Sequence, residues 1–185
     1  MLGEYLMARV ILDASHGGND LGVISGSRFE KDDNLNLALA VGDILTNNNI
    51  NVVYTRFGDY YISPITRTEI ANRESGDLLV TIHRGSSPAP NTNTGARAFI
   101  YEQEGINVAA ANNILMGLEE IGLSNVGISF RDVYILRNSN MPALEIVVGY
   151  IENDYDNAIF DNRFDEIAAI IADGIIEALE VYGIR

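Results

Sequence analysis

The sequence contains no cysteine, which excludes disulfide bonds and thiol chemistry. Basic side chains are also scarce: 12 Lys and Arg residues stand against 26 Asp and Glu residues, and the formal net charge is −14. Nucleic-acid binding needs a cluster of positive charge, so we exclude nucleic acid as a partner. The same charge argues against docking on an anionic membrane or cell wall by electrostatics alone.

Long apolar runs are absent as well. No stretch of the sequence is long enough to cross a bilayer as a helix. The opening segment "MLGEYLMARV" lacks the basic start, apolar core and small-residue cleavage site of a signal peptide. We therefore expect any export signal to be missing or to lie outside this chain.

What the chain does contain is an alternation of apolar runs with helical patterns over 185 residues, with no internal repeat. This alternation predicts a single α/β domain over residues 1–185, with an open, mostly parallel twisted sheet flanked by helices on both faces. The expected strands span residues 8–14, 50–55, 77–83, 96–102, 133–137 and 143–150. The expected helices begin at residue 32 or 33, at residue 64, at residue 105 and at residue 161.

The two histidines of the chain both follow apolar runs. His16 comes just after the first expected strand in "RVILDASHGG", and His83 ends the strand "DLLVTIH". Since carboxyl ends of parallel strands share one edge of a sheet, the histidines are expected to lie together there. Catalytic zinc commonly has two histidines and one glutamate as ligands. Glu30 precedes the first helix at the same edge, so we predict a zinc site of His16, Glu30 and His83.

Several motifs together resemble a known family. The segments "ILDASHGG", "FEKDDNLNLAL", "DLLVTIH" and "RNSNMPALEIVVGY" are similar to those of zinc-dependent N-acetylmuramoyl-L-alanine amidases of the bacterial autolysin type. The resemblance runs from about Val10 to the last helix, and it implies zinc ligands at His16, Glu30 and His83. It also implies hydrolysis of the amide between N-acetylmuramic acid and L-alanine, peptidoglycan or muropeptides as partners, and an extracellular or cell-wall location.

The sequence departs from this family at the second glutamate, which normally moves a proton from water to the leaving nitrogen. The matching position holds Val147. Glu145 points to the same side of the strand, but it is about 6.6 Å away along the strand. Glu145 is therefore a candidate displaced catalytic residue, and we expect weakened activity. Glu152 is a second candidate, with a plain surface acid as its alternative interpretation.

Other departures surround the expected site. Ser15 stands where the family has glycine, and Arg84 is one of two substitutions that follow the strand histidine. Arg84 is a candidate for binding substrate, and it is expected to place a cation near the metal or to neutralise Glu145, unless it is an ordinary surface arginine. Asn138 and Asn140 are candidates for binding a peptide backbone, with bonding inside their own turn as the alternative.

Three functional hypotheses follow from these residues. The first is a zinc amidase. The second is a catalytically inactive relative that binds metal and either peptidoglycan fragments or a protein partner. The third is a metal-free structural domain with an amidase-like scaffold. We recognise no wall-anchoring module in the sequence, so a wall-binding domain or partner outside this chain is expected.

Overall fold

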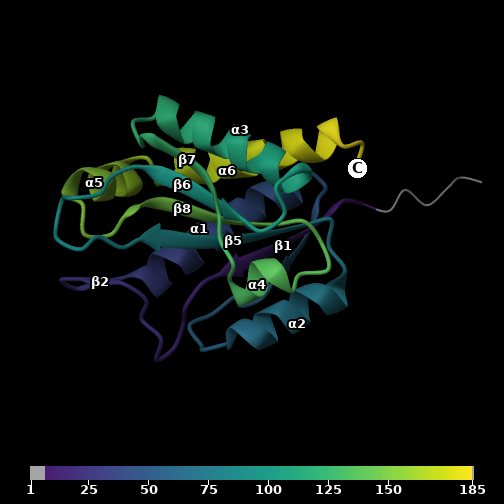
Figure 1. Ribbon diagram of the computed structural model, residues 1–185, viewed down its shortest axis with the longest axis horizontal. Helices are drawn as coiled ribbons and strands as arrows, with labels where there is room; N and C mark the ends of the chain where they lie inside the picture. Colours follow the sequence, from purple (N-terminus) through teal and green to yellow (C-terminus); the bar gives the residue numbers. More distant parts are fainter. Residues whose placement is uncertain (1–6, 185) are drawn as a thin grey trace, which may run out of the picture.

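Six strands form one central sheet in the computed structural model, which describes residues 7–184 (Figure 1). Their order is β4-β1-β5-β8-β6-β7, and every neighbouring pair is parallel except β6 and β8. The predicted α/β domain with a mostly parallel sheet is confirmed. The strands of this sheet are β1 (Arg9–Ala14), β4 (Asn51–Tyr54), β5 (Leu78–Gly85), β6 (Ala96–Ile100), β7 (Asn125–Phe130) and β8 (Ala143–Tyr150). A short hairpin of β2 (Ile24–Ser25) and β3 (Arg28–Phe29) lies apart from it.

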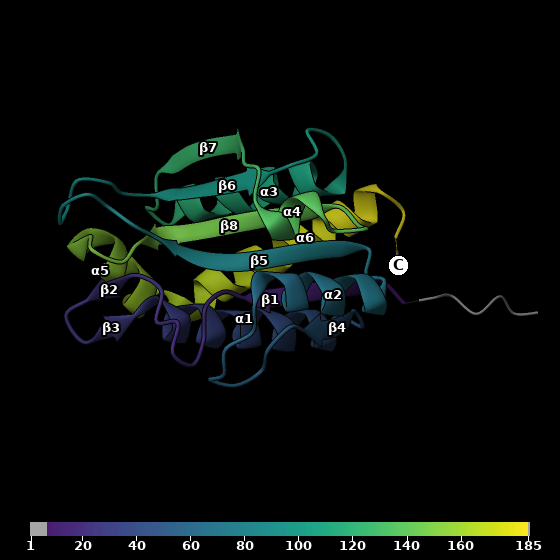
Figure 2. The ribbon, with the colours of Figure 1, turned by 60° about the horizontal axis from the view of Figure 1, so that its bottom comes forward.

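Helices cover both faces of the sheet, as Figure 2 shows. The helices are α1 (Glu30–Asn47), α2 (Pro64–Glu74), α3 (Ile106–Glu120), α4 (Tyr134–Arg137), α5 (Asp154–Asn162) and α6 (Phe164–Val181). The main apolar core lies between the sheet and α1, α3 and α6. A smaller core on the opposite face contains Ala71 of α2 and Leu136 of α4. Burial on both faces explains why the strands read as continuous apolar runs.

The helices α2 and α4 leave part of their face of the sheet uncovered. Leu79 of β5 and Ala143 of β8 belong to the small core beneath these helices. Further along the same two strands, His83, Glu145 and Val147 line a cavity instead. Because strand side chains alternate, all five of these residues point to one face. The cavity thus lies where the parallel strands β5 and β8 end.

The first helix begins two residues earlier than its acidic residues suggested. The predicted cap at Asp32 or Asp33 is wrong: α1 begins at Glu30, and Phe29 at the cap makes no side-chain hydrogen bond. The backbone N–H groups of Glu30 and Lys31 instead donate to the carbonyls of Val23 and Leu21 in the preceding loop. The first N–H groups of a helix have no partner within the helix, and a capping side chain commonly accepts their hydrogen bonds. Here the loop carbonyls take that role.

Two further predictions need correction. The segment 133–137 is not a strand, because residues 134–137 form α4 against α2. Short apolar runs do not distinguish a strand from a helix by periodicity alone. One edge of the sheet is formed by β7, whose exposed and half-buried residues carry no apolar run. The helix expected from residue 161 is α6, which begins at Phe164. A separate helix, α5, precedes it. Asn153 caps α5 by accepting hydrogen bonds from the N–H groups of Tyr155 and Asp156.

None of the helices between residues 7 and 184 combines the length and hydropathy needed to cross a bilayer.

Candidate metal centre

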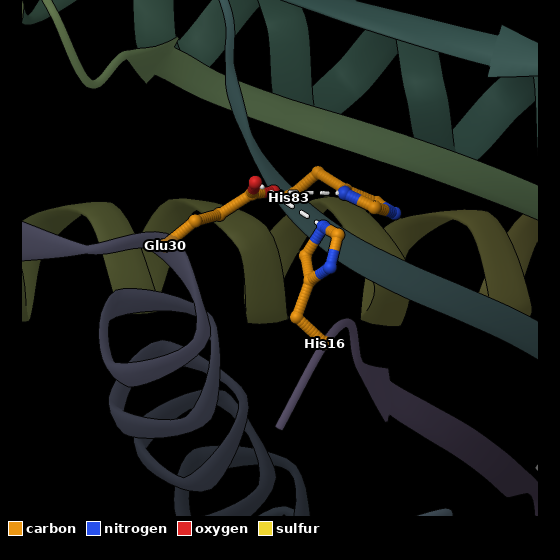
Figure 3. A group of neighbouring side chains, drawn as sticks. All are labelled: His16, Glu30 and His83. Atoms are coloured by element: carbon orange, nitrogen blue, oxygen red, sulfur yellow. Dashed lines mark hydrogen bonds and ion pairs between the residues drawn. The ribbon is translucent and has the colours of Figure 1, made fainter. Parts of the chain in front are cut away.

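Three side chains from separate elements meet at the carboxyl edge of the sheet (Figure 3). His16 follows β1, Glu30 begins α1 and His83 lies in β5, and their candidate ligand atoms are all within 4.8 Å of one another. Glu30 Oε1 lies 2.9 Å from His83 Nδ1, and Glu30 Oε2 lies 3.2 Å from His16 Nε2. The structure therefore brings together the three residues that the sequence predicted as ligands.

Buried arginines fix the backbone that presents His16. This residue has a φ of 63°, a left-handed conformation that turns the chain sharply after β1. Arg67 donates to the carbonyl oxygens of Ala14 and His16 at 2.6 and 2.5 Å, and to Asp13 Oδ1 at 2.8 Å. Arg56 donates to the carbonyl oxygen of Ala14 at 2.7 Å. These bonds hold the turn in place.

Gly22 lets the loop pass directly against two of the candidate ligands. Its φ is +66°, and a Cβ at this position would lie 2.6 Å from Glu30 Oε2 and 2.8 Å from His16 Cδ2. The next residue, Val23, donates its N–H to Glu30 Oε2 at 2.9 Å. A glycine is needed here both for the backbone conformation and for this close approach.

The cluster keeps Glu30 ionised although its side chain is buried. Burial raises the pKa of Glu30, but hydrogen bonds and charge attraction from His16 and His83 outweigh burial and hold the pKa far below its usual value. Burial lowers the pKa of His16, and the carboxylates of Glu30 and Asp20 outweigh it, so that the pKa is raised. A buried anion between two imidazoles is an arrangement that suits a divalent cation.

Each imidazole is oriented by a partner on its other nitrogen. His16 Nδ1 lies 2.9 Å from Asp20 Oδ1, and His83 Nε2 lies 2.6 Å from Ser15 Oγ. Ser15 Oγ is in turn 2.9 Å from Thr81 Oγ1. Metal-binding histidines usually have such partners, which fix the ring and its tautomer. His16 Nε2 and His83 Nδ1, which face Glu30, are therefore the nitrogens available to a metal.

The sequence motifs did not predict these outer partners of the histidines. Asp20 stands four residues after His16 in the glycine-rich loop, and its spacing was the available signal. Ser15 was noted only as a departure from the family pattern. Two nitrogens and one carboxylate, with oriented rings, form a donor set that fits zinc.

A family model described as N-acetylmuramoyl-L-alanine amidase matches residues 10–177. The chain belongs to this amidase family. It is 29% identical over 176 residues to an uncharacterized Bacillus subtilis protein, YqiI, covering 94% of this chain and 84% of that protein. It is also 29% identical over 154 residues to the sporulation-specific N-acetylmuramoyl-L-alanine amidase of Bacillus subtilis, covering 81% of this chain and 59% of that protein.

Solved structures of amidases share the fold. An N-acetylmuramoyl-L-alanine amidase from Clostridium difficile 630 is 31% identical with a TM-score of 0.88, covering 94% of this chain and 97% of that chain. The catalytic domain of the amidase CwlV from Bacillus (Paenibacillus) polymyxa is also 31% identical, with a TM-score of 0.85, covering 97% of this chain and all of that chain.

This member of the amidase family has no carboxylate at position 147, beside the cluster. Val147 of β8 pairs with His83 of β5, and the register is continuous from residue 79 to residue 83. Glu145 pairs with Thr81, about 6.6 Å back along the strand, and its carboxylate forms an ion pair with Arg131. Glu145 lines the cavity that contains the cluster.

Glu152 lies elsewhere in the amidase domain. Its carboxylate accepts a hydrogen bond from the N–H group of Ser87 at 3.0 Å, and the residue does not line the cavity of the cluster.

Arg84 lines the cavity, but its side chain points into the protein. The guanidinium is fully buried and lies 2.5 Å from Asp33 Oδ2, and burial lowers the pKa of Arg84 to about 10. The expected pairing of Arg84 with Glu145 is absent, since Arg131 takes that place. Arg84 contacts the site through its backbone N–H group, which donates a hydrogen bond to Glu30 Oε1 at 3.1 Å.

Asn138 and Asn140 lie outside the cavity that contains the cluster. The side-chain amide of Asn138 donates to the carbonyl of Tyr134 at 2.9 Å. Asn72 of α2 holds the segment, because its amide donates to the carbonyl of Asn138 and accepts from the N–H group of Asn140. The side chain of Asn138 therefore bonds within its own turn, and the backbone of both residues bonds to α2.

Proposed function

We propose that the chain is a zinc-dependent amidase that hydrolyses the bond between N-acetylmuramic acid and L-alanine in peptidoglycan or muropeptides. The observation that carries this proposal is the cluster of His16, Glu30 and His83 in a cavity of about 680 Å³. Family membership supports the bond type, and the donor set supports zinc.

The residues around the cluster prepare it for this chemistry. His16 Nε2, His83 Nδ1 and the Glu30 carboxylate would hold the zinc ion, which when bound supplies an activated water and polarises the scissile carbonyl. Glu30 is ionised in the cluster, so it offers a carboxylate to a cation. Asp20 and Ser15 keep the two rings in the orientation that binding requires.

The same proposal includes weakened activity. A well-placed general acid/base contributes about 10²–10⁴ in rate, and the position beside His83 is held by Val147. Glu145 lies on the same face and serves as the displaced proton-transfer group in this proposal. Its ion pair with Arg131 directs the carboxylate toward Arg131, which makes it a poor substitute.

The proposed place of action is the cell wall or the extracellular space. Relatives include a probable cell wall amidase, LytH, from Staphylococcus aureus, of which this chain spans 57%. We propose that a wall-binding domain or partner outside this chain supplies attachment, because a net charge of −14 does not favour an anionic wall.

The test combines a metal assay with a cleavage assay. The purified chain is resupplied with zinc, assayed for bound metal, and incubated with purified peptidoglycan while new L-alanine amino termini are counted. We expect about one zinc ion per chain and slow release. The variant Glu30→Gln should lose both, whereas Glu120→Gln, an exposed position on α3, should change neither.

Two results would contradict the proposal in different ways. Zinc binding without release, even after Val147→Glu, would favour a metal-binding relative that does not cut. A chain that binds no zinc would favour the metal-free scaffold.

A further inference from the structure

A row of neighbouring residues crosses the open face of the sheet beside the candidate metal-binding cluster of His16, Glu30 and His83. His83 of β5 pairs with Val147 of β8, and Val147 pairs with Arg97 of β6. Neighbouring strands lie about 4.8 Å apart, so the backbone of Arg97 is about 10 Å from that of His83. The three residues line one cavity. The backbone that carries the Arg97 side chain is therefore held at a fixed distance from the backbone of His83.

A second arginine converges on the same place. Phe99 lies two residues after Arg97 on the same face of β6, and Arg131 follows β7. The guanidinium carbons of Arg97 and Arg131 each lie 4.6 Å from the centroid of the Phe99 ring. Both arginines line the cavity of the metal cluster. The ring orders two flexible side chains and so lowers the entropy cost of binding an anion there.

The two guanidinium groups keep free hydrogen-bonding capacity. Arg131 uses Nη1 for its ion pair with Glu145. Arg97 forms no ion pair with any carboxylate in residues 7–184, and its hydrogen bond to Ser129 Oγ is long at 3.4 Å. Arg97 Nε is buried and has no hydrogen-bond partner. An unpaired buried donor costs free energy, so an acceptor that reaches Arg97 would be favoured.

We propose that Arg97 and Arg131 form a carboxylate-binding subsite for an acidic peptide substrate. An arginine fork matches the geometry of a carboxylate, and charge-assisted bonds of this kind are strong. A backbone separation of about 10 Å between Arg97 and His83 is the span of some three residues of extended peptide, which favours a carboxylate on a residue near the scissile amide. The identity of the substrate as a peptidoglycan peptide rests on the proposed function.

The subsite is tested by binding, without any cleavage step. The full chain is titrated calorimetrically with L-alanyl-D-glutamate and with the same dipeptide carrying both glutamate carboxylates as amides. We expect the acidic dipeptide to bind more tightly. Arg97→Gln should weaken its binding by about tenfold or more and leave the diamide unchanged. Arg97→Lys keeps the positive charge but lacks the forked guanidinium, so its affinity for the acidic dipeptide should lie between those of the unsubstituted chain and Arg97→Gln.

Arg73→Gln is the matched control, because Arg73 is an exposed arginine on α2, outside the cavity. It should bind both dipeptides as the unsubstituted chain does. Thermal unfolding of each variant reports whether it is folded. The proposal is overturned if the unsubstituted chain fails to bind the acidic dipeptide, if it binds the diamide equally well, or if a folded Arg97→Gln variant binds normally.

A cleavage assay separates this subsite from the proposed amidase activity. N-acetylmuramoyl-L-alanyl-D-glutamate should show a KM raised about tenfold in Arg97→Gln with kcat nearly unchanged. If Arg97→Gln cleaves with unchanged kinetics, the proposed subsite is contradicted and the proposed amidase activity is supported. If the dipeptide binds in an Arg97-dependent way but no variant cleaves the substrate, the proposed subsite is supported and the proposed amidase activity is contradicted.

Discussion

Val147 and His83 lie directly opposite each other on the neighbouring strands β8 and β5. The candidate metal-binding cluster therefore has an apolar neighbour at the position from which a carboxylate would reach it. Glu145, two residues earlier, is opposite Thr81 and is paired with Arg131. The proposed metal binding and the proposed proton transfer thus assign different residues, and they can be tested separately.

Restoring a carboxylate beside His83 should raise activity. We expect Val147→Glu to increase turnover by about 10²–10⁴, the usual contribution of a placed general acid/base. The control Val147→Gln has similar size but no acidic proton, and should give no such gain. The measurement is the initial rate of L-alanine amino-terminus release at matched zinc content. A Val147→Glu variant that binds zinc without faster release would indicate that the substrate-binding part of the site is altered.

Glu145 should carry the residual activity of the unsubstituted chain. We expect Glu145→Gln to lower that turnover about tenfold, because the amide still accepts a hydrogen bond from Arg131 but transfers no proton. In the Val147→Glu background the same change should matter less than about twofold. Equal rates for Glu145→Gln and the unsubstituted chain would exclude Glu145 from the reaction.

A methyl group at Gly22 should disrupt the metal cluster. Its Cβ would meet Glu30 Oε2 at 2.6 Å, so we expect Gly22→Ala to weaken zinc binding at least tenfold. Gly26→Ala is the matched control: its φ of +61° imposes similar backbone strain, but no atom lies within 4 Å of its Cβ. Zinc titration with a competing chelator measures both variants. Similar losses in the two would assign the effect to strain rather than contact.

Ser15 should tune zinc affinity through His83. Removing its hydroxyl frees His83 Nε2 and leaves the ring less well oriented. We expect Ser15→Ala to weaken zinc binding by about tenfold, within the range found for outer-layer partners of metal ligands. Ser124→Ala, at an exposed loop position, should have no effect. Unchanged zinc affinity in Ser15→Ala would show that the rest of the cavity already fixes His83.

Asp13 should make stability depend on pH in the acid range. Burial raises the pKa of Asp13, but Arg67 and the hydroxyls of Thr55 and Thr81 outweigh burial and lower it. The folded pKa then lies below the unfolded value near 4, so the stabilisation is complete above that value and is lost as the pH falls through the folded pKa. Asp13→Asn should cost about 3 kcal/mol at pH 7, because it leaves a buried arginine unpaired.

Urea unfolding at pH 7, 4 and 3 measures this linkage. The difference in unfolding free energy between the unsubstituted chain and Asp13→Asn should be greatest at pH 7 and should shrink below about pH 4. A difference that stays constant from pH 7 to pH 3 would show that Asp13 does not titrate between these values.

The strands with apolar runs could be predicted, and those without could not. Residues 8–14, 77–83 and 143–150 lie in the buried centre of the sheet, where burial on both faces demands apolar side chains. The edge strand β7 has largely exposed residues and so carries no such signal. The segment 133–137 has an apolar run because Leu136 packs on α2, and that packing is compatible with a helix.

From local patterns alone, the sequence predicted that His16 and His83 lie at the carboxyl ends of parallel strands and that Glu30 precedes the helix after the first strand. These features depend on local patterns, which repeat along the chain every two or every 3.6 residues. Only the tertiary structure decided that β6 lies antiparallel beside β8, with Arg97 next to Val147, and that Ser15 reaches His83. The order of strands follows from how whole helices and sheets pack together, and no local pattern records it.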